Sequence, residues 1–166
     1  MFCGIPCRCR KRIISVFCDI RRERTDIHIP ALQDKTAEFF EVCKTLADYV
    51  FLYCTSSLHD PLSVYGMAAA DKAVQLVTPD IRSAAYYASF EKTYEQIKSK
   101  SIGVINITDK DLYLPVGEVK AGFSNAKYIL PYSIYLKQQY ITGELTHKIP
   151  DQKFSAVCRG IAGAVL

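Results

Sequence analysis

The chain has 166 residues and a net charge of +4 at neutral pH; 49% of its residues are hydrophobic and 23% are charged. This length predicts one folded domain, and the composition is typical of a globular protein rather than a disordered or fibrous one. The sequence has no run of about 18 apolar residues, which excludes a membrane-spanning helix.

The chain has seven cysteines, an odd number, and its pattern does not indicate a disulfide framework. Four of them, Cys18, Cys43, Cys54 and Cys158, lie in apolar stretches, where cysteine behaves as a small buried hydrophobic residue. Basic residues interrupt the N-terminal segment before the apolar region of a signal peptide can form. We therefore expect a cytoplasmic protein without structural disulfides. Cys3, Cys7 and Cys9 have spacings that could ligate a metal, but no second Cys/His pair lies at zinc-ribbon distance, so we expect no metal site.

Basic residues concentrate near the N-terminus. They form a basic patch of Arg8, Arg10, Lys11, Arg12, Arg21, Arg22 and Arg24. Such a patch can contact the phosphates of DNA or an acidic membrane surface, although a solvated connector is the simpler interpretation. Residues 11–19 are β-branched and aromatic and predict a first strand. We interpret residues 1–25 as a basic tail with this strand, and residues 26–166 as the main α/β region.

The element around which the chain is organised is predicted at residues 49–54. These residues are apolar or aromatic and carry no charge, which indicates a strand covered on both faces, as in a parallel sheet. Before it, residues 27–30 predict a short strand that ends at Pro30. Residues 34–47 repeat apolar side chains at helical spacing and predict a helix.

A polar loop follows the central strand and contains Thr55, Ser56 and Ser57. Open α/β sheets bind ligands at the carboxyl ends of their strands, so this loop is a candidate binding segment. Asp60 is a favourable N-cap and Pro61 suits the first helical position, which together predict a helix over residues 61–70.

The remaining chain alternates strands with helices. Strands are predicted at residues 72–78, 102–107 and 128–130, and helices at 81–99, 115–123, 133–140 and 152–165. Asp80 and Asp151 are predicted N-caps. The inner stripe of the long helix would consist of Ile81, Ala84, Ala85, Ala88, Tyr94 and Ile97. This alternation predicts an α/β fold with a mostly parallel sheet flanked by helices.

Four segments carry a family resemblance by their order and spacing: residues 48–56, 69–80, 103–106 and 129–132. From about Asp26 onward, the chain resembles the ParA/MinD superfamily of deviant-Walker P-loop ATPases, and most nearly its TadZ/CpaE branch, which positions pilus-assembly machinery. In the family, these segments look like the Walker B strand with its switch loop, a strand ending in Pro-(Asp/Glu), a strand ending in a base-contacting Asn, and a loop beside adenine. The resemblance implies an adenine side formed by Asn106, Pro131 and Tyr132. It implies a switch-like loop formed by Thr55, Ser56, Ser57 and Asp60.

The phosphate-binding half departs from the family pattern. The family's first strand leads into Lys-Gly-Gly-x-Gly-Lys-(Ser/Thr), whereas here residues 19–25 follow the predicted strand and contain no glycine. Glycines let successive backbone N–H groups turn inward around phosphates, and the lysine reaches the terminal phosphate oxygens. Tyr53 occupies the place of the Walker B Asp, and a phenol is a poor Mg²⁺ ligand. The sequence thus predicts a truncated or degenerate P-loop NTPase-like domain that binds ATP and Mg²⁺ only if the phosphate site is supplied elsewhere.

Three functions are compatible with this pattern. The first is a degenerate ParA/MinD-like interaction or positioning module, inactive as an ATPase by itself, that binds a protein partner or a second copy through residues 55–66 and 108–125. In the family, the corresponding surface forms an ATP-sandwich dimer. The second is a fragment of an active ATPase for partitioning or for pilus or septum positioning. The third is a basic module that binds DNA or a membrane surface. None of these implies a small-molecule substrate.

Overall fold

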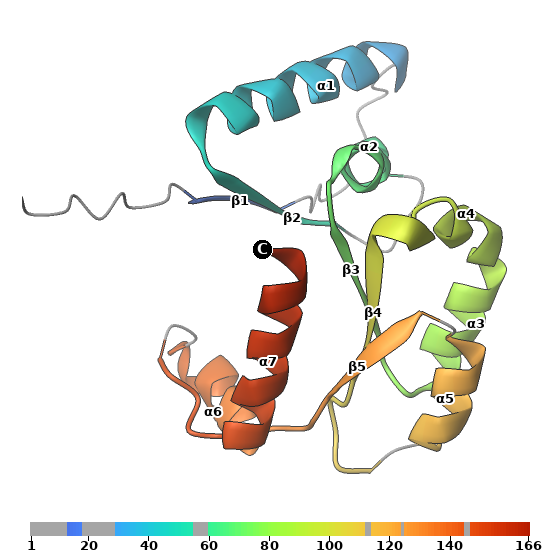
Figure 1. Ribbon diagram of the computed structural model, residues 1–166, viewed down its shortest axis with the longest axis vertical. Coiled ribbons are helices and arrows are strands. Elements are labelled where there is room, and N and C mark those ends of the chain that lie inside the picture. Colours follow the sequence, from blue (N-terminus) through green and yellow to red (C-terminus); the bar gives the residue numbers. More distant parts are fainter. Residues whose placement is uncertain (1–12, 18–28, 55–59, 112–113, 124, 145–146) are drawn as a thin grey trace, which may run out of the picture. The chain divides into compact units, whose positions relative to one another are not determined.

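The computed structural model describes residues 13–17, 29–54, 60–111, 114–123, 125–144 and 147–166 (Figure 1). By its internal contacts the chain divides into two compact units, residues 1–70 and residues 71–166.

The first unit contains a pair of parallel strands. Its elements are β1 (Ile13–Phe17), α1 (Ile29–Leu46), β2 (Tyr49–Tyr53) and α2 (Pro61–Ala69). β1 pairs with β2 along its whole length, with Ile13 opposite Tyr49 and Phe17 opposite Tyr53. Parallel neighbours require a crossover connection, and α1 lies within that connection.

Close packing of α1 and α2 forms the core of the first unit. Phe40 and Cys43 of α1 are buried, and the Phe40 ring stacks on Tyr65 of α2 with the ring centroids 5.9 Å apart. Gly66 faces β2, because a Cβ atom at this position would lie 3.1 Å from Leu52 Cδ1. The absence of a side chain at Gly66 thus allows α2 to approach the strand closely.

Two predictions for this region are wrong. Residues 29 and 30 begin α1 rather than end a strand, since proline is tolerated in the first turn of a helix, where its missing N–H is not needed. Residues 27 and 28 lie outside the described residues. β2 is not covered on both faces: Phe51 and Tyr53 are 45% and 62% exposed, whereas Leu52 points to the opposite face, toward α2.

The second unit is built on a three-stranded parallel sheet. Its elements are β3 (Ala73–Val77), α3 (Ile81–Ser89), α4 (Glu91–Glu95), the 3₁₀ helix η1 (Lys98–Lys100), β4 (Ser101–Asn106), α5 (Val116–Gly122), β5 (Ala126–Leu130), α6 (Ile134–Thr142) and α7 (Gln152–Val165). The strand order is β3-β4-β5, and both pairs are parallel (Figure 1). The predicted α/β class with a parallel sheet and flanking helices is confirmed.

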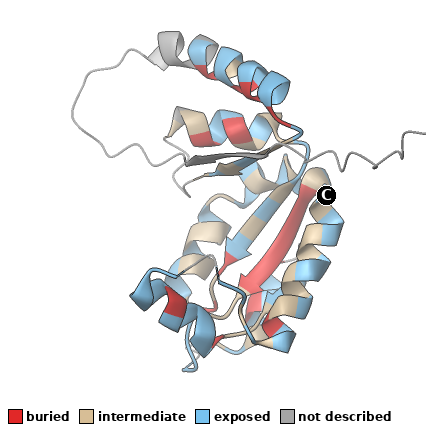
Figure 2. Cartoon of the chain, turned by 90° about the vertical axis from the view of Figure 1, so that its left-hand side faces the viewer, coloured by how far each residue is buried: buried red, intermediate tan, exposed pale blue. Residues whose placement is uncertain are grey.

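β4 is the buried centre of this sheet. Residues 101–105 are all buried, and the Val104 and Ile105 side chains have no exposed surface (Figure 2). On one face, Ile105 packs with Val119 and Phe123 of α5 and its flank. Residues 101–105 contain no ionisable side chain. This fits a strand buried on both faces, where the cost of removing a charge from water would not be repaid.

Helix α7 covers the opposite face of the sheet. Val104 lies beside Tyr128 of β5, on the other side of the sheet from Ile105. The Tyr128 hydroxyl donates a hydrogen bond of 3.1 Å to the carbonyl oxygen of Gly160 in α7. The Tyr128 ring lies 3.1 Å from the place where a Gly160 Cβ would be, so the helix backbone rests directly on this ring.

The long helix predicted over residues 81–99 is wrong, because it is interrupted at Phe90. The Phe90 backbone has φ −118° and ψ 16°, outside the helical region, and its ring packs on Tyr86 with the centroids 4.8 Å apart. Ile81, placed in the predicted inner stripe, is 73% exposed. Instead of Ile81, Tyr87 of α3 packs against the core.

None of the helices within the described ranges is both long and apolar enough to cross a membrane.

Gly103 has no room for a side chain, unlike Gly163 in α7. A Cβ at Gly103 would lie 2.5 Å from the Asn125 carbonyl oxygen, whereas a Cβ at Gly163 of α7 meets nothing within 4 Å. Gly103→Ala should therefore lower the free energy of unfolding by about 1–3 kcal/mol, as overpacking does. Gly163→Ala, the matched control, should raise it by about 0.5–1 kcal/mol through the lower helix propensity of glycine. Urea denaturation would measure both, and equal effects of the two variants would contradict the close approach.

Candidate functional site

The adenine-side residues predicted from the sequence meet at one edge of the second unit's sheet. Parallel strands end at a common edge, and Asn106 at the end of β4 lies opposite Leu130 at the end of β5. The pairing continues one residue further, because the Ile107 N–H donates to the Leu130 carbonyl oxygen at 2.9 Å. Pro131 and Tyr132 follow directly, and Asn106, Pro131 and Tyr132 are all half-buried. The structure thus brings these three residues to the place where open α/β sheets bind ligands.

A cation lies over the aromatic ring at this edge. The Lys110 ammonium is 6.0 Å from the centroid of the Tyr132 ring, at the outer limit of a cation–π contact. Asn106 offers amide donors and an acceptor, and Tyr132 offers a ring face. Together they could hold a planar, hydrogen-bonding group such as a purine, and Lys110 could contact an anion beside it.

Asp80 has a structural role at the same edge. Its carboxylate accepts a hydrogen bond of 2.8 Å from the Ser83 backbone N–H and another from the Thr78 hydroxyl. The Thr78 backbone N–H in turn donates to Ser83 Oγ at 3.1 Å. Two hydrogen bonds hold the pKa of Asp80 below its ordinary value: the one from the Thr78 hydroxyl has the larger effect, and the one from the Ser83 N–H the next largest. Asp80 is therefore the N-cap of α3, as predicted, and it ties the end of β3 to the helix.

Asp60, the one described member of the predicted switch-like loop, also caps a helix. Its Oδ2 accepts a hydrogen bond of 3.0 Å from the Ser63 backbone N–H, and Pro61 lies at the start of α2, as predicted. Thr55, Ser56 and Ser57 lie outside the described residues. Asp60 belongs to the first unit, whereas the adenine-side residues belong to the second.

The two strands of the first unit end side by side. Phe17 at the end of β1 lies beside Tyr53 at the end of β2, and the Tyr53 side chain is 62% exposed. Residues 18–28 connect β1 to α1; they lie outside the described residues, and their sequence contains no glycine. The basic patch also lies outside the described residues, so its arrangement stays a prediction. Its members are Arg8, Arg10, Lys11, Arg12, Arg21, Arg22 and Arg24.

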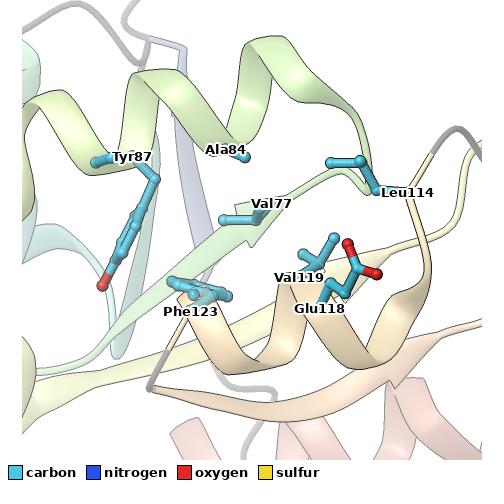
Figure 3. A pocket seen from close by; sticks show the side chains of 9 residues that line it. Val77, Ala84, Tyr87, Leu114, Glu118, Val119 and Phe123 are labelled. Carbon is cyan, nitrogen blue, oxygen red and sulfur yellow. The ribbon is translucent and has the colours of Figure 1, made fainter.

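A cavity that sequence analysis did not predict lies between α3 and α5 (Figure 3). It has a volume of about 280 Å³ and is lined by Val77, Ala84, Tyr87, Ala88, Leu114, Glu118, Val119, Gly122 and Phe123. Three of these, Ala84, Ala88 and Gly122, are small residues on helices that face one another. The small residues on α3 and α5 were the signal in the sequence that could have indicated this cavity. The sequence alone did not show that these two helices pack together.

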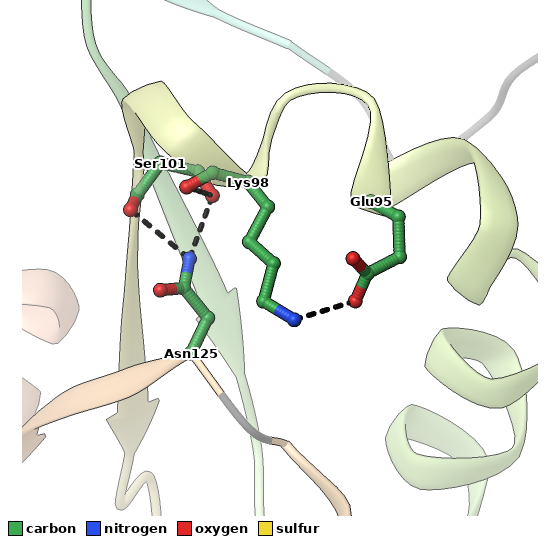
Figure 4. A network of polar contacts seen from close by, with 4 residues as sticks. All are labelled: Glu95, Lys98, Ser101 and Asn125. Carbon is green, nitrogen blue, oxygen red and sulfur yellow. Dashed lines mark hydrogen bonds and ion pairs between the residues drawn. The ribbon is translucent and has the colours of Figure 1, made fainter.

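Polar contacts at the opposite edge of the sheet hold the start of β4 (Figure 4). The Asn125 side-chain amide donates to the Ser101 carbonyl oxygen at 3.0 Å and to Ser101 Oγ at 2.6 Å. Nearby, the Lys98 ammonium and the Glu95 carboxylate form an exposed ion pair of 2.7 Å. These contacts fix local structure.

In the part of the chain that the structure describes, no three His, Cys, Asp or Glu residues are grouped to hold a metal ion.

Two solved structures share the fold of this chain. Comparisons with protein-family models and with curated proteins give no match. A ParA family ATPase from Chlorobium tepidum TLS aligns with a TM-score of 0.66 at 11% identity, covering 89% of this chain and 84% of that chain. The MinD cell division protein of Aquifex aeolicus aligns with a TM-score of 0.53 at 14% identity, covering 78% and 72%. The resemblance to ParA and MinD proteins is thus confirmed as a similarity of fold.

The role of Asp80 as a cap predicts a pH-dependent loss of stability. Asp80→Ala should lower the free energy of unfolding by about 1 kcal/mol at pH 7, as is usual for a lost N-cap. Because the folded pKa is below the ordinary value of 3.8, the stabilisation is present above that value and is lost as the pH falls through the folded pKa. The difference between wild type and variant in urea denaturation should therefore shrink below about pH 4. A difference that stays constant from pH 7 to pH 3 would contradict this role.

Proposed function

We propose that this chain, which has a ParA/MinD-like fold, is an interaction or positioning module that does not hydrolyse ATP by itself. One observation carries the proposal. Tyr53, rather than a carboxylate, stands at the end of β2 beside the end of β1, and the connection that leaves β1 contains no glycine.

The chemistry of the missing groups supports this proposal. Mg²⁺ selects carboxylate and phosphate oxygens, and a phenol such as that of Tyr53 replaces neither. A phosphate cradle requires backbone N–H groups to converge, which needs conformations that glycine adopts readily and other residues rarely adopt. Residues 18–28 supply three arginines but no glycine and no lysine. Arginine side chains can attract a phosphate, but they do not replace a backbone cradle with bound Mg²⁺.

The adenine side by itself provides little binding energy. Asn106 and Tyr132 offer one amide and one ring, and both are half-buried before any ligand binds. Charged phosphate groups normally supply the strong contacts, since charge-assisted hydrogen bonds are roughly twice as strong as neutral ones. We therefore expect no tight binding of ATP.

A protein partner or a second copy is the proposed ligand, through residues 55–66 and 108–125. In the described part of the first segment, α2 presents Val64 with 41% of its surface exposed. Val64 follows Ser63, which is fully buried, so the helix is anchored while this apolar side chain stays accessible. An apolar side chain on an anchored helix suits a protein contact.

Calorimetric titration with ATP in the presence of Mg²⁺ tests the proposal directly. We expect no saturable binding at micromolar ATP, and the ParA family ATPase from Chlorobium tepidum serves as the positive control for the family fold. Mg²⁺-dependent micromolar binding would contradict the proposal. Binding of adenosine that Asn106→Ala abolishes would show a working adenine side without a phosphate site.

Sedimentation velocity tests the protein-contact part separately. If the chain self-associates through α2, Val64→Asp should weaken the association roughly tenfold, because a buried charge at an interface costs more than about 1.4 kcal/mol. Adding Mg²⁺ and ATP should leave the distribution unchanged. Lys72→Asp, a charge change outside both segments, is the control. If the chain is monomeric, a protein partner captured by the wild type and lost with Val64→Asp would support the module, and equal capture by both would contradict this surface.

The basic patch favours a second candidate, binding to DNA. Seven cations within the first 24 residues would release counterions from a duplex, so the affinity should fall steeply with salt. Replacing Arg21, Arg22 and Arg24 by Ser should reduce the affinity for DNA. It should also make the plot of log affinity against log salt concentration less steep. An unchanged slope would assign any DNA binding to another surface.

A further inference from the structure

Helix α1 carries more apolar side chains than the packing of the first unit uses. One stripe, which runs to the residue after the helix, is at most 7% exposed and consists of Thr36, Phe40, Cys43 and Ala47. The residue before each of these forms a second stripe, with the same spacing of four, three and four residues, that stays in contact with solvent (Figure 2). We call this second stripe the exposed seam. It consists of Lys35, Phe39, Val42 and Leu46.

The apolar members of the exposed seam are accessible. Phe39 is 41% exposed, Val42 is 49% exposed and Leu46 is 55% exposed. Alternating steps of three and four residues place side chains in one row along a helix. Such a row is the pattern with which two α-helices pack against each other in a coiled coil. The chemistry of the exposed seam is therefore that of a contact with another helix.

The exposed seam continues into the α2 surface that is proposed above to bind a partner. The ring of Phe39 contacts that of Phe40 with the centroids 5.6 Å apart, and the Phe40 ring stacks on Tyr65 of α2. Tyr65 is itself 36% exposed, so accessible aromatic surface lies on both sides of the buried Phe40 ring. A helix that packs on α1 would therefore extend the contact made through α2.

We infer that the exposed seam binds the same seam of a second copy of this chain, with the two α1 helices antiparallel. The spacing of four, three and four residues is the same in both directions. An antiparallel copy therefore places Phe39 opposite Val42 and Lys35 opposite Leu46. This inference rests on the proposed role of the chain as an interaction module, and it names a second copy as the partner and α1 as the element that binds it.

The charges of α1 favour the antiparallel direction. In that arrangement the two Lys35 side chains lie at opposite ends of the contact, about 16 Å apart along the helix axis. Each ammonium then lies near the C-terminal end of the other α1, where the helix dipole is negative and where Asp48 adds an exposed carboxylate. A parallel arrangement would place the two Lys35 ammonium groups side by side, which is unfavourable.

The size of the exposed seam predicts a weak dimer. Stable interfaces bury about 800 Å² on each partner, from roughly 20–30 residues a side. A seam of three turns is smaller, even with the neighbouring Tyr65 of α2. We therefore expect an equilibrium between monomer and dimer that sedimentation velocity detects as a dependence on protein concentration. A wild-type chain that stays monomeric up to millimolar concentration would overturn the inference.

Substitutions on two sides of α1 localise the contact. Val42→Asp should weaken dimerisation roughly tenfold or more, because each dimer would bury two carboxylates. Val42→Thr keeps the shape of the side chain and should weaken it less. Lys44→Gln makes the same change in net charge on another side of the helix, where Lys44 pairs with Glu41, and should leave dimerisation unchanged. All three variants should keep the cooperative melt, because both positions are exposed. Equal effects of Val42→Asp and Lys44→Gln would overturn the seam.

A mixture of isotope-labelled and unlabelled chains tests the direction of the helices. We expect nuclear Overhauser effects between the Phe39 ring of one copy and the Val42 methyl groups of the other. Effects between the two Phe39 rings instead would contradict the antiparallel arrangement. Comparison with Val64→Asp separates this inference from the proposed function. If Val64→Asp disrupts the dimer and Val42→Asp does not, the interaction role stands and the seam fails; the reverse result supports the seam and excludes the α2 surface.

Discussion

The second unit depends on the desolvation of β4. Five successive residues of this strand are buried, so both faces need apolar cover and both edges need hydrogen-bonding partners. β3 and β5 supply the edges, α5 covers the Ile105 face, and α7 rests on Tyr128 beside the Val104 face. The close approach of the Asn125 backbone to Gly103 follows from the same requirement, because the loop before β5 must enter next to the buried strand. The position of each neighbouring element therefore follows from one buried strand.

This arrangement explains which polar residues are available for binding. Asp80 lies near the carboxyl end of β3 and Asp60 lies directly before α2, and the carboxylates of both accept hydrogen bonds from backbone N–H groups of the helices that they cap. Asn106 ends the buried strand itself, where its side chain remains half-buried at the edge. Acidic residues near strand ends are often read as catalytic or metal-binding, yet here their geometry is that of helix starts. The chemistry of the sheet edge is consequently carried by an amide, a phenol and a lysine.

Local signals in the sequence predicted much of the fold. Asp151 and the apolar spacing after it predicted α7 over residues 152–165, as the structure has it, and Asp60 with Pro61 predicted the start of α2. The errors arise where tertiary packing decides. Phe90 leaves the helical conformation as its ring packs on Tyr86, and no local pattern indicates that interruption. The resemblance implied that Asn106, Pro131 and Tyr132 form one side of a site, and the paired ends of β4 and β5 bring them to one edge. The cavity was not predicted, because its walls come from helices separated in sequence by a strand.

The order of the strands has a consequence for how the second unit forms. β3, β4 and β5 are neighbours in the sheet and also consecutive in the chain. Each crossover can therefore close before the next strand is present. The pairings still span whole helical crossovers, as between Ala73 and Ser101 or Gly103 and Ala126, and parallel pairing of this kind is intrinsically slower to form than local helical contacts. During synthesis, the sheet can grow one strand at a time from the ribosome, with α7 arriving last to shield its second face.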